Sequence, residues 1–246
     1  MSILDRSEPP KDLLALPTVK FFKTDITLID NISAAVNGTV QWTSETKAAL
    51  GGVINCAGVG VASKIIDARN QSHSLELWDF ALAVNLTGTF NLTRLVLEHL
   101  IKVEPEPGTD GERGVVIFVA SAAAVRICPS TCKTHLTSGQ FEGQPGQTAY
   151  AATKGALVSM TLPMARDLSR HAIRVATIAP GVFDSSMTVN FPAKTRRSLE
   201  NDGIIYPKRF GQPHEFARTV RFIIDCAYIN GETIRLSGAG RLPGKL

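Results

Sequence analysis

Short β-branched runs alternate with longer amphipathic stretches along this chain, and this alternation constrains the fold more than any other feature. Several of the short runs are almost continuously apolar, as strands buried on both faces should be. The predicted strands are 2–5, 18–25, 51–58, 114–121, 173–181 and 232–238. The predicted helices are 28–49, 75–83, 86–103, 149–171 and 213–227, and Thr27 and Asp30 fit a capping box that opens the first of them. The alternation predicts an α/β fold, a Rossmann-like doubly wound parallel sheet flanked by helices.

Unusual residues follow three of these strands. "NCAG" (55–58) follows the third strand, Ser121 closes the fourth, and "PGVF" (180–183) follows the fifth. Each alone is ordinary turn chemistry, because Gly, Pro, Asn and Ser end strands in many proteins. Their shared position at the carboxyl ends of parallel strands predicts a ligand site at that edge of the sheet.

Composition excludes several classes of protein. The chain has 246 residues, 44% of them apolar and 20% charged, and a formal charge of +4. It has no Lys/Arg block that would indicate nucleic acid, and no uninterrupted apolar run long enough to span a bilayer. The start, "MSILDRSEPPKD", has no pattern of a targeting signal. The four cysteines have no zinc-site spacing, so we expect no bound metal. We expect the protein to be in a reducing intracellular compartment.

Tyr150 and Lys154 are four residues apart in a predicted helix, so they lie on one face of it. A neighbouring ammonium favours the phenolate, and we expect Lys154 to lower the pKa of Tyr150 into a range useful for acid/base catalysis. Chance alone yields Y-x-x-x-K in roughly one such chain in eight, and an exposed structural pair would look the same. The pair needs support from the rest of the sequence.

That support comes from a set of motifs, which are "DIT" (25–27), "NCAG" (55–58), "VNLTGTF" (84–90), Ser121, "YAATK" (150–154) and "IAPGVF" (178–183). Together they resemble the short-chain dehydrogenase/reductase family, and the resemblance runs from about residue 2 to the C-terminus. It implies that Tyr150 is the acid/base, Lys154 lowers its pKa and binds the nicotinamide ribose, and Ser121 orients the substrate. Asn85 would hold a proton-relay water near the lysine. The implied cofactor-binding residues are Asp5, Asp25, Ile26, Asn55, Cys56, Ala57, Gly58, Tyr150, Lys154, Pro180, Gly181, Val182, Phe183 and Ser185.

The resemblance also implies a nicotinamide cofactor. Asp5 matches the acidic residue that ends the second strand and accepts the ribose hydroxyls, which favours NAD over NADP. Arg6 weakens this preference, because an arginine there can accept a 2′-phosphate. Ser237 stands where the family often has Asp.

The usual first strand and its glycine-rich turn are missing from this sequence. If Asp5 ends the second strand, the G-x-x-x-G-x-G turn that binds the pyrophosphate should lie about 20 residues or more upstream. We therefore expect one Rossmann-like domain over 1–246, incomplete at its N-terminus. Either residues 2–25 pair directly with the strand at 51–57, or two strand edges stay unpaired, at about 1–3 kcal/mol for each buried orphan group. We expect no stable fold without such a rearrangement.

Residues 125–140 are the second departure. They separate Ser121 from Tyr150 by 29 positions, and removing them restores the spacing of the family. One interpretation is a genuine loop insertion, which chain entropy tolerates. The other is a retained intron, because valine codons begin with GT, a glutamine codon can end in AG, and the segment is in frame.

Three functions remain open from the sequence. The first is NAD(H)-dependent oxidation or reduction of a secondary alcohol or ketone, with a 3-hydroxyacyl-CoA or a hydroxysteroid as the small-molecule substrate. The second is a 3-oxoacyl-carrier-protein reductase, and the third is a catalytically inactive scaffold or oligomer partner. By resemblance we expect a homotetramer in the cytoplasm or the mitochondrial matrix, without nucleic acid or membrane.

Overall fold

The computed structural model describes residues 1–241 except 106, 109 and 125–142. The proposed insertion at 125–140 lies outside the described residues. The strands are β1 (Ser2–Asp5), β2 (Lys20–Lys23), β3 (Gly52–Asn55), β4 (Gly114–Val119), β5 (Ile173–Pro180) and β6 (Thr233–Leu236). All six predicted strands are confirmed, with ends trimmed by up to three residues.

The helices also follow the predicted pattern. The α-helices are α1 (Lys11–Leu14), α2 (Ile29–Thr46), α3 (Leu75–Leu82), α4 (Thr89–Leu100), α5 (Thr148–Leu168), α6 (Ala193–Ser198) and α7 (Pro213–Asp225). The 3-10 helices are η2 (Ala122–Ala124) and η3 (Ser169–His171), and the π-helices are η1 (Ala83–Gly88) and η4 (Leu199–Gly203). The sequence did not predict α1, α6 or the π-helical turns.

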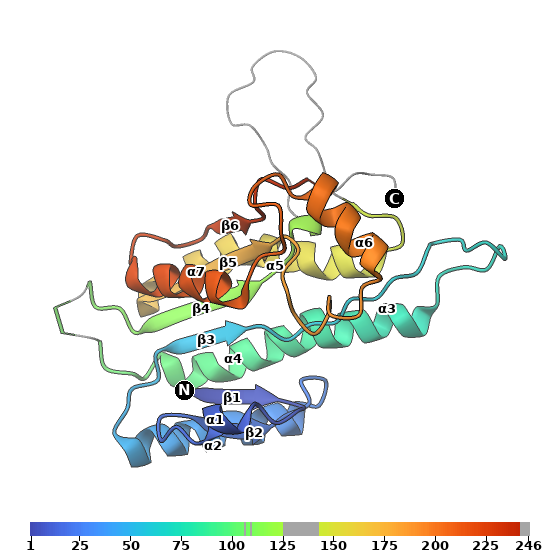
Figure 1. The fold of residues 1–246 in the computed structure, drawn as a ribbon. Helices are drawn as coiled ribbons and strands as arrows, with labels where there is room; N and C mark the ends of the chain where they lie inside the picture. The colour runs from blue at the N-terminus through green and yellow to red at the C-terminus, as the bar shows by residue number, and fades with distance from the viewer. Residues whose placement is uncertain (106, 109, 125–142, 242–246) are drawn as a thin grey trace.

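The strands form two sheets rather than one. In the described chain β1 pairs only with β2, and the other sheet has the order β3-β4-β5-β6, all pairs parallel. Figure 1 shows β1 between β2 and β3, with all three strands pointing the same way. Of the two alternatives, direct pairing of 2–25 with 51–57 is therefore wrong, and two unpaired edges are what the described residues have. Because Ser2–Leu4 and Gly52–Val53 are only half-buried, water reaches part of these edges.

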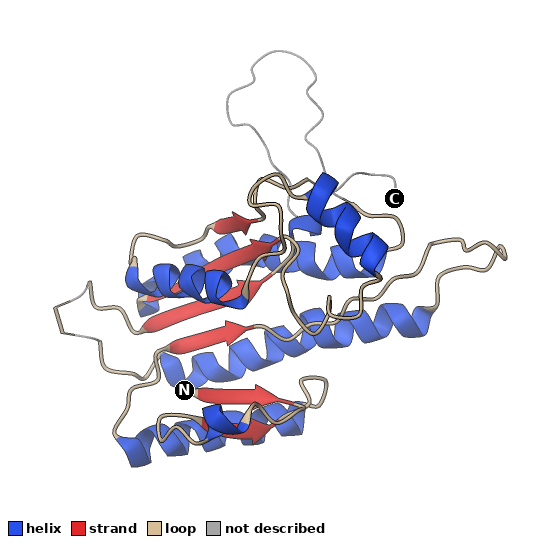
Figure 2. Ribbon diagram, in the orientation of Figure 1, coloured by secondary structure: helices blue, strands red, loops and turns tan. Residues whose placement is uncertain are grey.

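Helices cover both faces of the four-stranded sheet (Figure 2). On one face α5 packs against β4 and β5, with Leu157, Val116 and Val175 fully or almost fully buried. On the other face Ile223 of α7 packs on Ile117, whose side chain points the opposite way from its neighbour Val116. The predicted doubly wound α/β class is confirmed.

A third cluster links the two sheets. Helices α2 and α4 contribute Ile32, Val36, Leu92 and Val96 to this cluster, and Leu4 of β1 and Val53 of β3 both pack against it. The two sheets thus share a helical layer although no ladder joins them within the described part of the chain.

Helix α2 does not begin as the sequence suggested. Thr27 and Asp30 fit a capping box, but the N-cap is Leu28 and has no side-chain cap. Instead Thr27 donates its backbone N–H and its hydroxyl to Asp25 Oδ1, at 2.9 and 2.6 Å. The predicted capping box is wrong because this nearby carboxylate already binds the hydroxyl.

Helices α3, η1 and α4 form one continuous helix over Leu75–Leu100. By length and composition alone it is apolar enough to cross a membrane, with 39% of its most apolar stretch buried. The search of the sequence for an uninterrupted apolar run missed this helix because Asn85 and the threonines interrupt the run. Leu92, Val96 and Leu100 of this helix are core residues of the packed fold.

Candidate active site

The predicted ligand edge is assembled as expected. In the four-stranded sheet Asn55 of β3 is in register with Phe118, and Val119 is in register with Ile178. This register places Asn55–Gly58, Ser121 and Pro180–Ser185 at the same carboxyl edge. The first turns of α5 then bring Tyr150 and Lys154 to it.

Tyr150, Lys154 and Ser121 lie together at this edge. Lys154 Nζ is 6.0 Å from the centroid of the Tyr150 ring and donates a hydrogen bond of 2.8 Å to the carbonyl oxygen of Val119, the last residue of β4. The Ser121 hydroxyl hydrogen-bonds the Tyr150 phenol, and the Ala123 N–H donates to Ser121 Oγ at 3.2 Å. Each of the three side chains is therefore held by an element of the four-stranded sheet or by α5.

Burial controls the ionisation of this pair. Desolvation raises the pKa of Tyr150, and the hydrogen bond from Ser121 opposes it only in part. Desolvation also lowers the pKa of Lys154 to about 8, against a smaller opposing effect of Cys56. The expectation that Lys154 lowers the pKa of Tyr150 is wrong for the protein by itself, because burial is the larger effect. Tyr150 is a protonated phenol at neutral pH.

Asn85 occupies the π-helical turn η1 and is fully buried. Its Oδ1 accepts the Val59 N–H at 2.7 Å, and its Nδ2 donates to the Val59 carbonyl at 3.0 Å and to Thr153 Oγ1 at 3.2 Å. π-Helical turns are frequent at functional sites because the extra residue re-aims a side chain. The side chain of Asn85 therefore holds the loop after β3 against α5.

The loop after β3 passes close to the lysine. A Cβ on Gly58 would lie 3.0 Å from Lys154 Nζ and 3.4 Å from Asn85 Oδ1, so a larger residue here would displace the end of the lysine side chain. Asn55 is buried and donates to Thr93 Oγ1 at 3.1 Å, but its Oδ1 has no hydrogen-bond partner. Cys56 and Ala57, between them, are exposed at this edge. A buried acceptor without a partner marks a place where a ligand donor would fit.

The residues that were predicted to bind the adenine half of the cofactor lie at the ends of the two strands β1 and β2. Asp5 ends β1 and accepts the Ser7 N–H at 2.9 Å. Asp25 follows β2, and its carboxylate binds Thr27 and lies 3.5 Å from Arg6 Nε. Hydrogen bonds from Thr27 lower the pKa of Asp25. Ile26, the third predicted residue here, packs against the cluster of α2 and α4.

The segment at the end of β5 carries the remaining residues that were predicted to bind the cofactor. Gly181 N–H donates to the Leu236 carbonyl at 2.8 Å, and Phe183 meets Phe216 edge to face at 6.1 Å. Ser185 N–H donates to Thr188 Oγ1 at 3.0 Å, which closes the turn. Pro180 and Val182, the other predicted residues, are half-buried beside them.

Sequence reasoning missed Thr153. It is fully buried, donates its hydroxyl to the Tyr150 carbonyl at 2.8 Å and accepts from Asn85. It therefore connects Asn85 with the helical turn that carries Tyr150. Its place inside "YAATK", three residues after Tyr150, was the available signal, since threonine often bonds backward along a helix.

The site fits one half of a dinucleotide. The Lys154 ammonium, the hydroxyls of Tyr150 and Ser121, and the unpartnered Asn55 Oδ1 at the end of β3 are groups that suit a ribose and a nicotinamide carboxamide. The sequence contains no G-x-x-x-G-x-G and no G-x-G-x-x-G, the turns whose N–H groups bind a pyrophosphate. Residues 1–246 therefore fit the nicotinamide end of a dinucleotide cofactor, and they do not supply the usual turn that binds its pyrophosphate.

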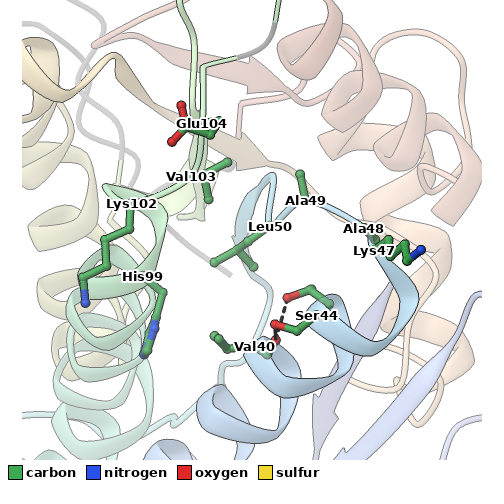
Figure 3. A pocket seen from close by; sticks show the side chains of 11 residues that line it. Val40, Ser44, Lys47, Ala48, Ala49, Leu50, His99, Lys102, Val103 and Glu104 are labelled. Atoms are coloured by element: carbon green, nitrogen blue, oxygen red, sulfur yellow. Dashed lines mark hydrogen bonds between the residues drawn. The ribbon is translucent and has the colours of Figure 1, made fainter.

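A pocket of about 420 Å³ lies at the other end of the strands (Figure 3). It lies between the final turns of α2 and α4, and its wall includes Leu50, just before β3, and Val103. Lys47, His99 and Lys102 are also among its lining residues. None of the predicted site residues lines this pocket.

The structure thus has a parallel sheet whose carboxyl edge carries a tyrosine and a lysine four residues apart, together with a serine and an asparagine. These features place the chain in the class of Rossmann-type proteins. A family model described as enoyl-(acyl carrier protein) reductase matches residues 5–238. The chain belongs to this family, the short-chain dehydrogenases/reductases.

Individual relatives agree with this assignment. The chain is 39% identical over 225 residues to 3-hydroxyacyl-CoA dehydrogenase type-2 of Drosophila melanogaster, covering 91% of this chain and 79% of that protein. It is 45% identical over 190 residues to the Bos taurus protein of the same name, covering 77% of this chain but only 66% of the relative. A crystal structure of 3-hydroxyacyl-CoA dehydrogenase type-2 from Mycobacterium avium matches with a TM-score of 0.78 at 33% identity, over 92% of this chain and 79% of that one.

Proposed function

We propose that this chain is an NAD(H)-dependent oxidoreductase acting on a secondary alcohol or ketone. The observation that carries the proposal is the contact of Tyr150 with Ser121 and Lys154 at the carboxyl edge of the sheet. The names of the relatives support a 3-hydroxyacyl-CoA as the substrate, with a hydroxysteroid as the alternative.

In the direction of reduction, Tyr150 donates its phenol proton to the ketone oxygen. Burial keeps this proton in place at neutral pH, because it raises the pKa of the phenol. Ser121 donates a hydrogen bond to the same oxygen. Lys154, mainly protonated at pH 7 because its pKa is about 8, stabilises the phenolate that remains. A bound nicotinamide supplies or accepts the hydride.

In the direction of oxidation, the phenolate of Tyr150 takes the proton of the alcohol. Asn85 and Thr153 keep the turn of α5 and the loop at Val59 in place during this exchange. The residues from Asn55 to Gly58 would lie along the ribose, and Pro180–Ser185 would lie beside the nicotinamide. Asp5 would accept the adenine-ribose hydroxyls, which favours NAD over NADP.

Exposed apolar side chains beside the site suit an acyl chain or a steroid. Met187 lies over Gly60, where an added Cβ would be 3.0 Å from Met187 Cε. Val189, Phe191 and Ile205 follow it and are 69%, 38% and 59% exposed. A segment with so much uncovered apolar surface beside a catalytic edge is suited to contact an apolar substrate.

The test begins with NADH binding to purified 1–246, followed by nicotinamide fluorescence. Turnover is then measured with acetoacetyl-CoA and with a steroid ketone, from the loss of NADH absorbance. We expect saturable binding and faster turnover of the acyl-CoA, with NADPH binding more weakly. A folded protein that turns over neither ketone would refute the proposed activity.

The second candidate function is a scaffold without catalysis. Residues 1–246 carry no G-x-x-x-G-x-G turn, and a scaffold would not need one. A folded chain that binds no NADH at any concentration would support it. The family model's description favours a further variant, in which the acyl group is carried by a carrier protein, and competition between acyl-CoA and acyl-carrier substrates distinguishes the two.

We also propose that the chain forms a homotetramer. Phe80 of α3 and Phe90 of α4 are 42% and 47% exposed, more than apolar side chains of this size usually are. Light scattering after gel filtration measures the assembly. Phe90→Glu should weaken it, and an unchanged mass would show that this helix is not the contact.

A further inference from the structure

Between β5 and α7 the chain makes one excursion, residues 184–211, which we call the α6 segment. Backbone hydrogen bonds close its two ends: the Asp184 N–H donates to the Gly211 carbonyl at 2.9 Å, and the Gly211 N–H donates to the Val182 carbonyl at 3.0 Å. Figure 1 shows α6 at the end of the molecule toward which β4, β5 and β6 point. The segment is therefore attached by its ends to the carboxyl edge that carries the candidate site.

Apolar packing does little to hold helix α6 in place. None of its residues, Ala193–Ser198, is buried. Val189 and Phe191, which precede the helix, are 69% and 38% exposed. A helix this short depends on contacts with the rest of the protein, because its own hydrogen bonds do not offset the entropy of forming it. The position of α6 therefore depends mainly on polar contacts.

Arg196 makes these contacts. Its Nη2 donates to Asp184 Oδ1 at 2.7 Å, and its Nε donates to Glu200 Oε1 at 3.1 Å. Its guanidinium carbon lies 4.3 Å from the centroid of the Phe210 ring, which is fully buried. A guanidinium can bond to carboxylates and stack on an aromatic ring at the same time. One side chain thus contacts the beginning, the middle and the end of the α6 segment.

Asp184 is held in place by the rest of the fold. In addition to its backbone bond to Gly211, its Oδ2 accepts a hydrogen bond from Gln212 Nε2 at 2.6 Å. Gln212 is the N-cap of α7, and its N–H donates to the Glu215 carboxylate at 2.8 Å. Hydrogen bonds from Arg196 and Gln212 lower the pKa of Asp184, so its carboxylate is charged at neutral pH. Arg196 therefore attaches α6 to a carboxylate that the start of α7 keeps in position.

The α6 segment reaches across the candidate site. It starts directly after Phe183, on the β5 side. Met187 lies beside the loop after β3, since a Cβ added to Gly60 would be 3.0 Å from Met187 Cε. Gly58, two residues earlier in this loop, adjoins Lys154 Nζ. A displaced segment would thus open one side of the site, whereas the bond of Lys154 to β4 would stay.

We propose that Arg196 is a positioning residue for the substrate: its contacts with Asp184 and Phe210 hold the α6 segment across the carboxyl edge, where the segment forms one wall of the substrate site. This proposal rests on the proposed oxidoreductase function. Arg196 does not touch the reacting atoms. Its loss should therefore weaken the binding of the acyl or steroid part of the substrate and leave proton and hydride transfer nearly unchanged.

Steady-state kinetics with acetoacetyl-CoA and NADH compares wild type, Arg196→Met and Asp184→Asn. We expect each variant to raise KM by about tenfold, because each breaks the charged hydrogen bond between the two residues. For Arg196→Met we expect kcat within about twofold of wild type and an unchanged Kd for NADH. The double variant should raise KM no further than either single one, because both changes remove the same contact.

Two further variants separate the role of this guanidinium from a general effect of charge. Arg197→Met is the matched control, since Arg197 is the next residue of α6 and is exposed; it should leave KM unchanged. Arg196→Lys should restore KM only in part, because an ammonium lacks the planar fork that bonds Asp184 and stacks on Phe210. An unchanged KM in Arg196→Met, a loss in kcat alone, or an equal effect of Arg197→Met would overturn the proposal.

Hydrogen exchange tests the attachment of α6 without turnover. The Leu199 N–H bonds to carbonyls at the end of α6, and the Thr177 N–H, bonded to the Glu232 carbonyl, is the reference within the sheet. We expect about tenfold faster exchange at Leu199 in Arg196→Met, with no change at Thr177. Unchanged exchange at Leu199 would overturn the proposal even in an active enzyme. Faster exchange in a protein that reduces neither ketone would support the attachment of α6 by Arg196 and refute the oxidoreductase function.

Discussion

The four-stranded region and the two-stranded region of this protein are built from the same kind of parallel strand, but they differ in how completely the strands are covered. In β4 and β5 every residue but the last of each strand is buried, since both edges are paired and helices cover both faces. In β1 and β2 no residue is fully buried, and one ladder joins them. Tyr150, Lys154, Ser121 and Asn85 depend on the first region, and Asp5 and Asp25 on the second. The predicted catalytic residues thus lie on the more completely covered region, and the two carboxylates predicted to bind the adenine end of the cofactor lie on the less covered one.

The largest expected effect tests whether the first region is an active site at all. Tyr150→Phe should lower kcat by about 10²–10⁴-fold, because the proton donor is lost while the packing of the ring stays. Tyr228→Phe is the matched control, since Tyr228 is 99% exposed and far from this chemistry in the sequence. Steady-state rates with acetoacetyl-CoA measure both. Equal rates for wild type and Tyr150→Phe would remove the catalytic role from this region.

The next effect tests the stability of the four-stranded region. Arg174 on β5 makes two hydrogen bonds to Glu112, at 2.8 and 2.9 Å, and donates to the carbonyls of Ile223 and Ile224 near the end of α7. Arg174→Met should cost about 3–5 kcal/mol of unfolding free energy, because it leaves a half-buried carboxylate and several carbonyls without their partner.

The matched control for Arg174 is Arg221→Met. Arg221 pairs with Asp225 on the surface and its side chain is 76% exposed, so its loss should change stability by less than about 0.5 kcal/mol. Urea unfolding followed by circular dichroism measures both variants. Similar losses in the two would show that the buried network adds nothing to this region.

The pH dependence of stability tests how tightly the first region encloses Lys154. Its pKa is about 8 in the folded protein against 10.5 in a free lysine, so the unfolded chain binds more protons between these values. Unfolding free energy should therefore rise with pH from about 8 to 10, by at most about 1.4 kcal/mol per unit. Above 10 the raised pKa of Tyr150 acts in the opposite sense.

Lys154→Met should remove this rise, and Lys208→Met, at an exposed position, should keep it. Urea unfolding at a series of pH values measures all three proteins. If Lys154→Met keeps the full slope, the rise comes from other groups and Lys154 is better hydrated than the structure indicates.

A smaller effect tests the packing contact between the helical turn at Gly88 and the segment after β2, which connects the two regions. Gly88, where η1 meets α4, packs on the segment after β2, and an added Cβ would lie 2.5 Å from the Ile26 carbonyl oxygen. Gly88→Ala should cost about 1–3 kcal/mol, since backbone would have to shift. In Gly155→Ala the new Cβ meets nothing within 4 Å, and the variant should gain about 0.5–1 kcal/mol. Thermal unfolding of the two variants measures this contrast. If Gly88→Ala leaves the stability unchanged, the helical turn at Gly88 does not pack tightly on the segment after β2.

The smallest effect lies within the two-stranded region. Arg6 Nε is 3.5 Å from Asp25 Oδ2, and the arginine side chain is 73% exposed. Arg6→Gln should change unfolding free energy by less than about 1 kcal/mol, and added salt should erase the difference. A loss of unfolding free energy well above this value would show that the ion pair is essential for holding β1 and β2 together.

Sequence reasoning located the elements, and the carboxyl edge at which the motif residues meet, correctly because both follow from local patterns. The strand "GVVIFV" and the pair Tyr150–Lys154 can be recognised from residue types and periodicity alone. It missed Thr153, because the partner of its hydroxyl, Asn85, is 68 residues away. It misjudged the cap of α2, because the competing acceptor Asp25 lies outside the helix.

The amino-acid sequence by itself determined the alternation of strands and helices, the membership of the family and the residues at the carboxyl edge. Only the tertiary structure decided that β1–β2 stays apart from β3, and that burial raises rather than lowers the pKa of Tyr150. The periodicity of apolar residues indicates which face of each segment has to be buried. Ladder partners and desolvation, in contrast, depend on which distant segments arrive beside it, and these are properties of the packed molecule.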